Sequence, residues 1–327
     1  MLSRAVMERE PEPQPGPAAY HAPEPFSLTA QGQELTFYPS GDDRLRAVLE
    51  TIGAAQHSLK LFFYIFSTDD CAKRVRDALV EAAARGVHVI LIVDDFGSRA
   101  DDIFLAPLTR AGGTVRRFSA NWNARYLIRN HQKMLICDED VAIIGGFNIE
   151  QAYFDPPEKN GWNDLAVRLR GDAVERLAQW FALLDAWTAQ GRVRMLEARR
   201  QIRRWDAGPG SVRWLVGGLS QRLGPWARSV ITDIESASRL DMMVAYFSPR
   251  RGIMRRMARV PRLGSVRLLL AAKSDNAATI GAARSLYARL LDAGAQIYEF
   301  EPCKLHAKLV VVDDAVYIGS ANFDMRS

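Results

Sequence analysis

Apolar runs alternate with amphipathic segments along most of the chain. Val87–Val93 is an unbroken apolar run of strand length, which is typical of a strand buried on both faces of a sheet. The preceding segment, Asp69–Arg85, has helical periodicity and stops at Gly86, a residue suited to a helix C-terminus. A helix around Phe104–Ala111 and a strand over Thr114–Phe118 follow. Strands that alternate with helices in this way predict an α/β layer fold.

The same order of elements returns in the second half of the chain. Val266–Ala271 repeats the buried strand, and Arg239–Tyr246 before it is predicted as a strand, as Ser58–Phe66 is in the first half. A helix over Ala282–Ala293 and a strand over Gln296–Phe300 complete the repeat. A duplication of such a long period predicts two paired lobes rather than a solenoid.

Three parts of the chain are therefore expected. Residues 1–34 form a flexible tail, since six prolines fall within its first 26 residues. Residues 35–205 form the first lobe with a connecting helix over Asp172–Arg204, and residues 206–327 form the second lobe. The other elements predicted for the first lobe are a helix over Asp42–Ala55 and strands over Leu35–Tyr38 and Leu165–Leu169.

Composition narrows the class of protein without changing this outline. With 48% hydrophobic and 25% charged residues, the 327-residue chain is globular rather than disordered or fibrous. No apolar run reaches about 18 residues and no signal core opens the chain, so neither a membrane-spanning helix nor secretion is expected. Cys71, Cys137 and Cys303 are too few and too scattered for a disulfide framework, which fits a reducing compartment.

Each repeat ends in the same string: a histidine, a lysine two positions on, an aspartate after a short apolar stretch, and a glycine-containing turn that ends in asparagine. The strings comprise His131, Lys133, Asp138 and Asn148 in the first repeat and His306, Lys308, Asp313, Ser320 and Asn322 in the second. The two histidines lie in different halves of the chain. A single His-x-Lys could belong to an ordinary surface strand, but a string of five positions repeated at the matching end of two repeats indicates a site.

Strand alternation places each histidine and its lysine on one face, because residues two apart point the same way. An ammonium group beside an imidazole suits a phosphate: the lysine neutralises oxygen charge, and the histidine attacks or transfers a proton. The glycines allow close backbone approach, and each asparagine offers an amide to the same pocket. Asp138 is roughly 20 Å from its histidine along an extended chain. We therefore interpret Asp138 and Asp313 as turn-forming supports.

These strings resemble the paired motifs of the phospholipase D superfamily, and the residues around them are closer still to bacterial cardiolipin synthases of the branch without N-terminal membrane helices. The matching segments are Arg129–Lys133, Gly145–Ile149, Tyr246–Pro249, Leu305–Lys308 and Gly319–Ser327. The resemblance extends from Leu35 to the end of the chain. It implies an α/β fold of two similar lobes, each a mixed sheet flanked by helices, related by a pseudo-twofold axis and sharing one active site.

The resemblance also implies a two-step transfer through a phosphohistidine, without metal or cofactor. We expect His131 as the nucleophile and His306 as the general acid and base, although the near-symmetry of the motifs leaves the reverse assignment open. The groups expected to stabilise the anionic oxygens are Lys133, Lys308, Asn148, Asn322 and Ser320. The sequence agrees about metal, since it shows no cluster of carboxylates or His/Cys at ligand spacing.

A histidine in this role needs a carboxylate behind it to fix its tautomer. Asp164 directly precedes the predicted strand Leu165–Leu169, at about the distance after His131 where family members place an acidic residue, so we assign it as the orienting group. A second acid should follow the second motif, but the chain ends at Ser327, soon after His306. Either the chain is a fragment or its second lobe lacks an edge strand and an acidic partner, and we expect it to be poorly active.

The net charge of +5 conceals an uneven distribution. Residues 191–270 contain 17 arginines, no lysine and 5 acidic residues, a net charge of +12 that leaves −7 for the rest of the chain. This segment also holds Trp205, Trp214 and Trp226. Arginine with tryptophan suits an anionic membrane surface, although a solvated basic helix face over core tryptophans, or a nucleic-acid surface, fits the same residues.

Three activities follow from these features. The first is a phosphatidyltransferase that acts on phosphatidylglycerol, forms cardiolipin and releases glycerol. The second is a phospholipase D that hydrolyses phospholipids to phosphatidic acid, and the third is a phosphodiesterase nuclease or a membrane-binding protein without activity. We expect the first, in a cytoplasmic protein held peripherally on the inner membrane. A nucleic acid is not the expected partner, and no oligomer is required, because one chain carries both motifs.

Overall fold

The computed structural model describes residues 20–119, 131–189, 195–216, 225–262, 264–274 and 277–323. The strands up to residue 170 are β1 (Phe26–Ala30), β2 (Gln33–Tyr38), β3 (Ser58–Phe63), β4 (His88–Asp94), β5 (Thr114–Phe118), β6 (Lys133–Cys137), β7 (Val141–Gly145), β8 (Trp162–Asn163) and β9 (Ala166–Arg170). The helices up to residue 204 are α1 (Gly41–Ala54), α2 (Asp70–Ala84), α3 (Asp102–Arg110), α4 (Ala173–Ala189) and α5 (Met195–Arg204). The later elements are α6 (Pro225–Ser236), β10 (Arg239–Val244), α7 (Arg251–Met257), β11 (Ser265–Ala271), α8 (Ala277–Arg284), α9 (Tyr287–Leu291), β12 (Gln296–Phe300), β13 (Lys304–Leu305), β14 (Lys308–Val312) and β15 (Ala315–Ile318).

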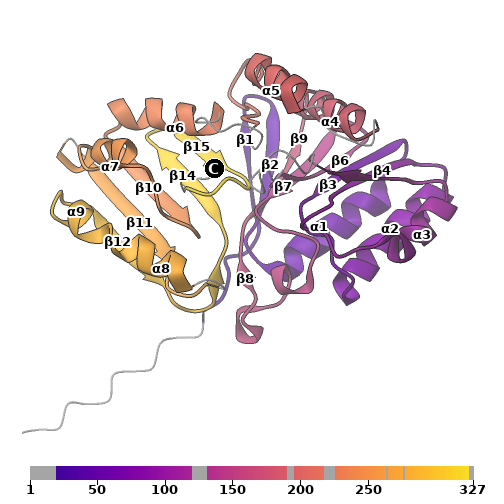
Figure 1. Ribbon diagram of the computed structural model, residues 1–327, viewed down its shortest axis with the longest axis horizontal. Coiled ribbons are helices and arrows are strands. Elements are labelled where there is room, and N and C mark those ends of the chain that lie inside the picture. Colours follow the sequence, from indigo (N-terminus) through magenta and orange to yellow (C-terminus); the bar gives the residue numbers. More distant parts are fainter. Residues whose placement is uncertain are drawn as a thin grey trace, which may run out of the picture.

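Two lobes lie side by side, each built on a mixed sheet flanked by helices (Figure 1). The first sheet has the strand order β1-β2-β9-β7-β6-β3-β4-β5, and the second has the order β12-β11-β10-β14-β15. In reverse, the second order is β15-β14-β10-β11-β12, and it corresponds strand for strand to β7-β6-β3-β4-β5 of the first sheet. The duplication predicted from sequence is therefore present in the fold. The parallel pair of β8 and β13 connects the two lobes.

The central strands β3 and β4 of the first sheet are buried on both faces. Leu61 and Leu91 point into a core with α1, α2 and α3, whereas their neighbours Phe62 and Ile92 point into a second core with α4. Figure 1 shows α1 to α3 on one side of this sheet and α4 and α5 on the other. Because alternate residues of β3 and β4 serve two cores, the apolar run at Val87–Val93 has no polar alternation, as predicted.

The expected tail boundary at residue 34 is wrong in its last part. Residues 1–19 lie outside the described residues, but β1 pairs antiparallel with β2 through a two-residue turn at Gln31 and Gly32, with φ of 47° and 80°. Positive φ at both positions is the geometry of a tight hairpin. Phe26 stacks on Phe37 with ring centroids 4.7 Å apart. The prolines before residue 26 indicate a flexible segment, and the strand that follows them is too short for its alternation to outweigh that signal.

Two predicted helices are each two helices in the structure. The segment 172–204 contains α4 and α5, and Trp187 donates to the Gln201 side chain at 2.5 Å, so α5 folds back on α4. The segment 282–293 contains the end of α8 and all of α9, separated at Ser285, whose hydroxyl donates to the Ala282 carbonyl and so competes with the helical pattern. Within the described ranges, no helix combines the length and apolar character that crossing a bilayer requires.

Candidate active site

Both motifs begin at the same place in their sheets. Lys133 opens β6 opposite Phe63, the last residue of β3, and Lys308 opens β14 opposite Val244, the last residue of β10. Each histidine comes two residues before its strand, at the edge where the parallel strands of its lobe end. This topology brings one His-Lys pair from each lobe to the connection between the lobes.

His131 is half-buried against residues from both motifs. Lys133 Nζ lies 2.9 Å from His131 Nδ1 and donates to the His131 carbonyl at 2.7 Å. The Tyr64 ring covers the imidazole, with the ring centroids 4.7 Å apart. From the second motif, the carbonyl oxygen of Ser320 lies 3.4 Å from His131 Nδ1. The two motifs, which lie in different halves of the sequence, therefore meet around this imidazole.

His306 is bonded to an aspartate of the other lobe. Its Nδ1 lies 2.6 Å from Asp164 Oδ2, and the two side chains are 5% and 0% exposed. The backbone supports this contact, because β13 pairs with β8 and the His306 amide donates to the Asn163 carbonyl at 2.7 Å. Asp164 follows His131 in sequence, yet the structure pairs it with the histidine of the second motif. Lys308 Nζ also donates to the His306 carbonyl.

The electrostatics of the site favour an anion. Burial lowers the pKa of His306 to about 4, an effect that Lys308 increases and Asp164 opposes. Burial raises the pKa of Asp164, but the charge and hydrogen bond of His306 outweigh it and lower that pKa to about 2. Burial and the nearby Lys308 also hold the pKa of Lys133 well below its ordinary value. A bound phosphate would offset this repulsion between buried cationic groups.

The pKa of His131 shows that the two halves act on one another. Burial lowers this pKa well below the ordinary value, and the charges of Lys133, Lys308 and His306 lower it further. Two of these three groups come from the second motif. A negative ligand that touches both lysines would therefore change the protonation of both histidines together.

The two asparagines occupy equivalent positions in the turns. Asn148 is buried, accepts from the Ile65 amide at 3.0 Å and donates to the Tyr153 hydroxyl at 3.0 Å. Its amide therefore holds Tyr153, which packs edge-on against His306 with centroids 5.0 Å apart. Asn322 comes directly before Phe323, which forms a bridge with Phe247. These contacts give Asn148 a supporting place beside the site.

The motif aspartates lie at the far ends of the motif strands, away from the histidines. Asp138 has a φ of 51° and accepts from the amides of Gln56, His57 and Ser58 at 2.7–2.9 Å. Asp313 has a φ of 47° and accepts from Ser238 and Arg239 in the same way. Each carboxylate thus ties the turn after one strand to the start of the neighbouring strand.

Arg44 is a residue of this site that sequence reasoning missed. Its side chain is buried in the first lobe, and its guanidinium donates to four backbone carbonyls, those of Pro39, Tyr153, Trp162 and Asp164. Three of these four residues touch His306 or its ring. A lone arginine in an amphipathic helix carries no sequence signal for this role, since most such arginines face water.

Among the described residues, no group of three or more His, Cys, Asp or Glu is placed to hold a metal ion. The chain's own side chains offer the site two imidazoles, two ammonium groups and one carboxylate. An imidazole paired with a carboxylate can carry a proton, and a second imidazole beside a lysine can approach a phosphorus atom.

The chain matches the family model described as "Cardiolipin synthase, PLD-like domain" over residues 48–184 and 230–327. It is 32% identical over 314 residues to a cardiolipin synthase of Geobacillus thermodenitrificans, and 31% identical over 312 residues to cardiolipin synthase 2 of Bacillus cereus. These matches cover 93% and 92% of this chain but only 62% and 60% of the relatives. The chain thus spans about three fifths of the length of those curated relatives.

Two solved structures are similar in fold. A phosphatidylserine synthase from Haemophilus influenzae matches with a TM-score of 0.63 over 89% of this chain and 78% of its own. A polyphosphate kinase from Porphyromonas gingivalis matches with a TM-score of 0.56 over 90% of this chain and 46% of its own. At 14% sequence identity in each case, these similarities concern the fold alone.

Proposed function

The chain belongs to the cardiolipin synthase, PLD-like domain family, and from that premise we propose that it transfers a phosphatidyl group between two molecules of phosphatidylglycerol, forming cardiolipin and releasing glycerol. The observation that carries the proposal is the hydrogen bond between Asp164 and His306, since it ties the histidine of the second motif to a carboxylate of the first lobe. In this proposal the two lobes are two half-sites, each of which supplies one His-Lys pair.

The proposed first step is attack on phosphorus by His131. A bond forms between an imidazole nitrogen and phosphorus while the bond to the departing glycerol oxygen breaks, and His306 gives its proton to that oxygen. Asp164 suits His306 for this role, because a carboxylate on Nδ1 stabilises the imidazolium and leaves Nε2 to carry the proton.

The proposed second step reverses the first with a different alcohol. Neutral His306 takes the proton from a hydroxyl of the second phosphatidylglycerol, whose oxygen attacks phosphorus and displaces His131. Lys133 and Lys308 stabilise the anionic oxygens in both steps, and Ser320 and Asn322 are proposed to bind them from the second turn. Asn148 contributes by holding Tyr153 beside His306.

An anionic membrane surface is the proposed partner of the arginine-rich segment 191–270. Exposed arginines on α5 and α7, including Arg203 and Arg255, support this electrostatic contact. The tryptophans of the segment are engaged within the protein instead. Trp214 is 9% exposed in the first lobe's core, Trp205 packs against that core and donates to the Trp214 carbonyl at 2.8 Å, and Trp226 packs on Phe323. We propose that within this segment the arginines, and not the tryptophans, bind the inner membrane peripherally.

The decisive experiment incubates the full chain with phosphatidylglycerol vesicles and identifies the products. Cardiolipin with an equal amount of glycerol supports the transferase, whereas phosphatidic acid in place of cardiolipin would show hydrolysis, and cleavage of DNA with inert lipids would show a nuclease. His131→Ala and His306→Ala should each abolish turnover, while His88→Ala, at an exposed histidine of β4, should retain it. Turnover that survives in either of the first two variants would contradict the mechanism.

A further inference from the structure

We infer that the rim of the site in the first lobe inserts into the phospholipid bilayer through Phe96 and Ile103. The inference deepens the proposed function, on which it rests for the identity of the substrate as a membrane lipid. It concerns residues outside the arginine-rich segment and an apolar contact rather than an electrostatic one.

Phe96 and Ile103 are large apolar side chains that the fold leaves exposed. Phe96 is 68% exposed and Ile103 is 85% exposed. Their neighbours on α3 face the protein instead: Leu105 is 1% exposed, and the Phe104 ring contacts Phe66 with centroids 6.4 Å apart. The loop and the first turn of α3 therefore expose two large apolar side chains among charged ones, while Phe104 and Leu105 pack toward the protein.

The loop between β4 and α3 is held firmly by hydrogen bonds. The Asp94 carboxylate, 4% exposed, accepts from the amides of Phe96 and Gly97, both at 3.0 Å. The Phe66 carbonyl accepts from the amides of Arg99 and Ala100 and from the Ser98 hydroxyl, at 2.9–3.0 Å. Because these backbone groups are bonded within the protein, the loop can enter a membrane interface without losing hydrogen bonds to water.

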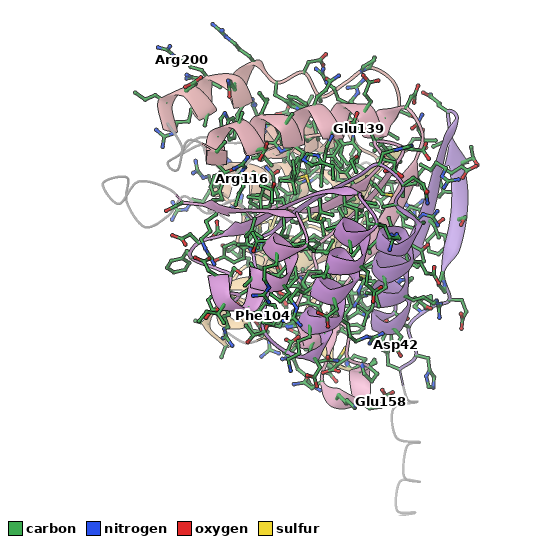
Figure 2. All side chains as sticks on the ribbon, turned by 90° about the vertical axis from the view of Figure 1, so that its right-hand side faces the viewer. Asp42, Phe104, Arg116, Glu139, Glu158 and Arg200 are labelled. Atoms are coloured by element: carbon green, nitrogen blue, oxygen red, sulfur yellow. The ribbon has the colours of Figure 1, made fainter. Side chains whose placement is uncertain are left out.

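This loop packs against Tyr64, the residue that covers His131. Gly97 is packed so closely that a methyl group there would be 2.5 Å from the Tyr64 carbonyl oxygen, and the Tyr64 ring covers His131. The loop follows β4, at the same edge of the sheet at which β6 begins with Lys133. In Figure 2, Phe104 of α3, Arg116 of β5 and Arg200 of α5 lie along one side of the lobe, with Glu139 toward the other.

The position next to His131 identifies a bilayer as the occupant. A phosphatidyl group bound to this histidine keeps its two acyl chains in the membrane, and only a glycerol unit separates them from the phosphorus. The rim of the site must therefore reach the boundary between headgroups and acyl chains, the depth at which apolar side chains of peripheral proteins insert. Residues 94–102 hold four aspartates and one arginine, and Asp102 pairs with Arg117 at 2.7 Å, so anionic lipid does not drive the contact.

Vesicle flotation tests the inference without turnover if all proteins carry His131→Ala. The double variant Phe96→Ser/Ile103→Ser should reduce the vesicle-bound partition coefficient by roughly tenfold or more, on phosphatidylcholine as well as on phosphatidylglycerol. The matched control is Leu291→Ser, at a 50% exposed leucine that ends α9, before β12 begins and away from the site edge, and it should bind like its parent. Equal binding by the double variant, or an equal loss in the control, would overturn the inference.

A second measurement does not depend on how the double variant folds. In vesicle-bound protein, lipids brominated on their acyl chains should quench more tryptophan fluorescence in Phe96→Trp than in its parent. Equal quenching in the two proteins would overturn the inference. If the double variant instead changes concentration-dependent self-association, the side chains serve a second copy and the inference is wrong. If the wild type forms cardiolipin but the double variant binds vesicles as its parent does, the inference alone is refuted. If binding changes as predicted but the wild type forms no cardiolipin, only the proposed function is refuted.

Discussion

Replacing Arg44 with methionine should both destabilise the first lobe and slow the reaction. The guanidinium is 1% exposed and donates to the carbonyls of Pro39, Asp164, Tyr153 and Trp162 at 2.6, 2.5, 2.7 and 3.2 Å. Methionine fills a similar volume but donates nothing, so these buried carbonyls lose their donor. The segments that carry Tyr153, Trp162 and Asp164 to His306 would then lose their common anchor.

The size of the loss follows from this geometry. Hydrogen bonds from a charged donor contribute about 1.5–3 kcal/mol each, but the substitution also removes the cost of burying a guanidinium. Because a buried acceptor left without its donor costs about 1–3 kcal/mol and four carbonyls are affected, we expect the free energy of unfolding to fall by about 3–5 kcal/mol after this offset. At roughly 2–4 °C per kcal/mol, the midpoint of thermal unfolding should fall by about 10 °C.

Urea unfolding and steady-state kinetics, measured on the same preparations, check this prediction. The control is Arg46→Met on the same helix, where a 60% exposed arginine pairs only with Asp43 and Glu50 and should contribute about 0–1 kcal/mol. Arg44→Lys should recover little, because an ammonium group cannot span all the carbonyls. If Arg44→Met destabilises the protein no more than Arg46→Met does, the anchoring role of Arg44 is wrong.

The remaining predictions concern charge in the site. Asp164→Asn should lower kcat by roughly 10²- to 10⁴-fold, because an amide cannot stabilise protonated His306. The control Asp185→Asn, which removes a salt-bridged carboxylate on α4, should keep kcat within about twofold. Equal kcat values in the two variants would refute the pairing of Asp164 with His306. The pKa of His306 is about 4 in the folded chain and about 6.5 when unfolded, so the unfolded state binds the proton first. The free energy of unfolding should then fall as pH drops from about 6.5 to 4. Urea titrations at several pH values should show that this dependence on pH is weaker in His306→Gln, and an unchanged dependence would contradict the lowered pKa of His306. Inorganic phosphate should raise the calorimetric unfolding midpoint of the wild type more than that of Lys133→Met, because the anion offsets repulsion between buried cations; equal shifts would exclude Lys133 from the anion site.

Local patterns in the sequence predict most of the fold. The apolar run at Val87–Val93 indicates a strand covered on both faces, and its repeat at Val266–Ala271 indicates two lobes, because strand burial and chain alternation are local properties. The break at Ser285 and the hairpin at Gln31 escape prediction, because a side-chain hydrogen bond and two positive φ values decide them. Neither feature changes the period of the apolar pattern.

The contacts of the site are predicted less completely. Sequence spacing places His131 with Lys133 and His306 with Lys308, because each pair lies on one short extended segment. It does not predict that Asp164 serves His306, which is distant in sequence, since that contact depends on how β8 and β13 join the lobes. The sequence also does not predict that arginines and tryptophans of residues 191–270 separate in the fold, where the described tryptophans pack in or against the cores and arginines such as Arg203 and Arg255 are exposed.

The central claim, a phosphohistidine formed in a site shared by two motifs, is tested most directly by mass spectrometry of the enzyme caught during turnover. Wild-type protein mixed with phosphatidylglycerol and quenched with denaturant in the cold at mildly alkaline pH, where both the phosphorus–nitrogen bond and the acyl esters survive, would be digested and its peptides compared with those of His131→Ala. The account predicts the mass of a phosphatidyl group on the peptide that contains His131, and none on that peptide in the variant. Turnover without an adduct on either histidine, or an adduct on His306 alone, would contradict it.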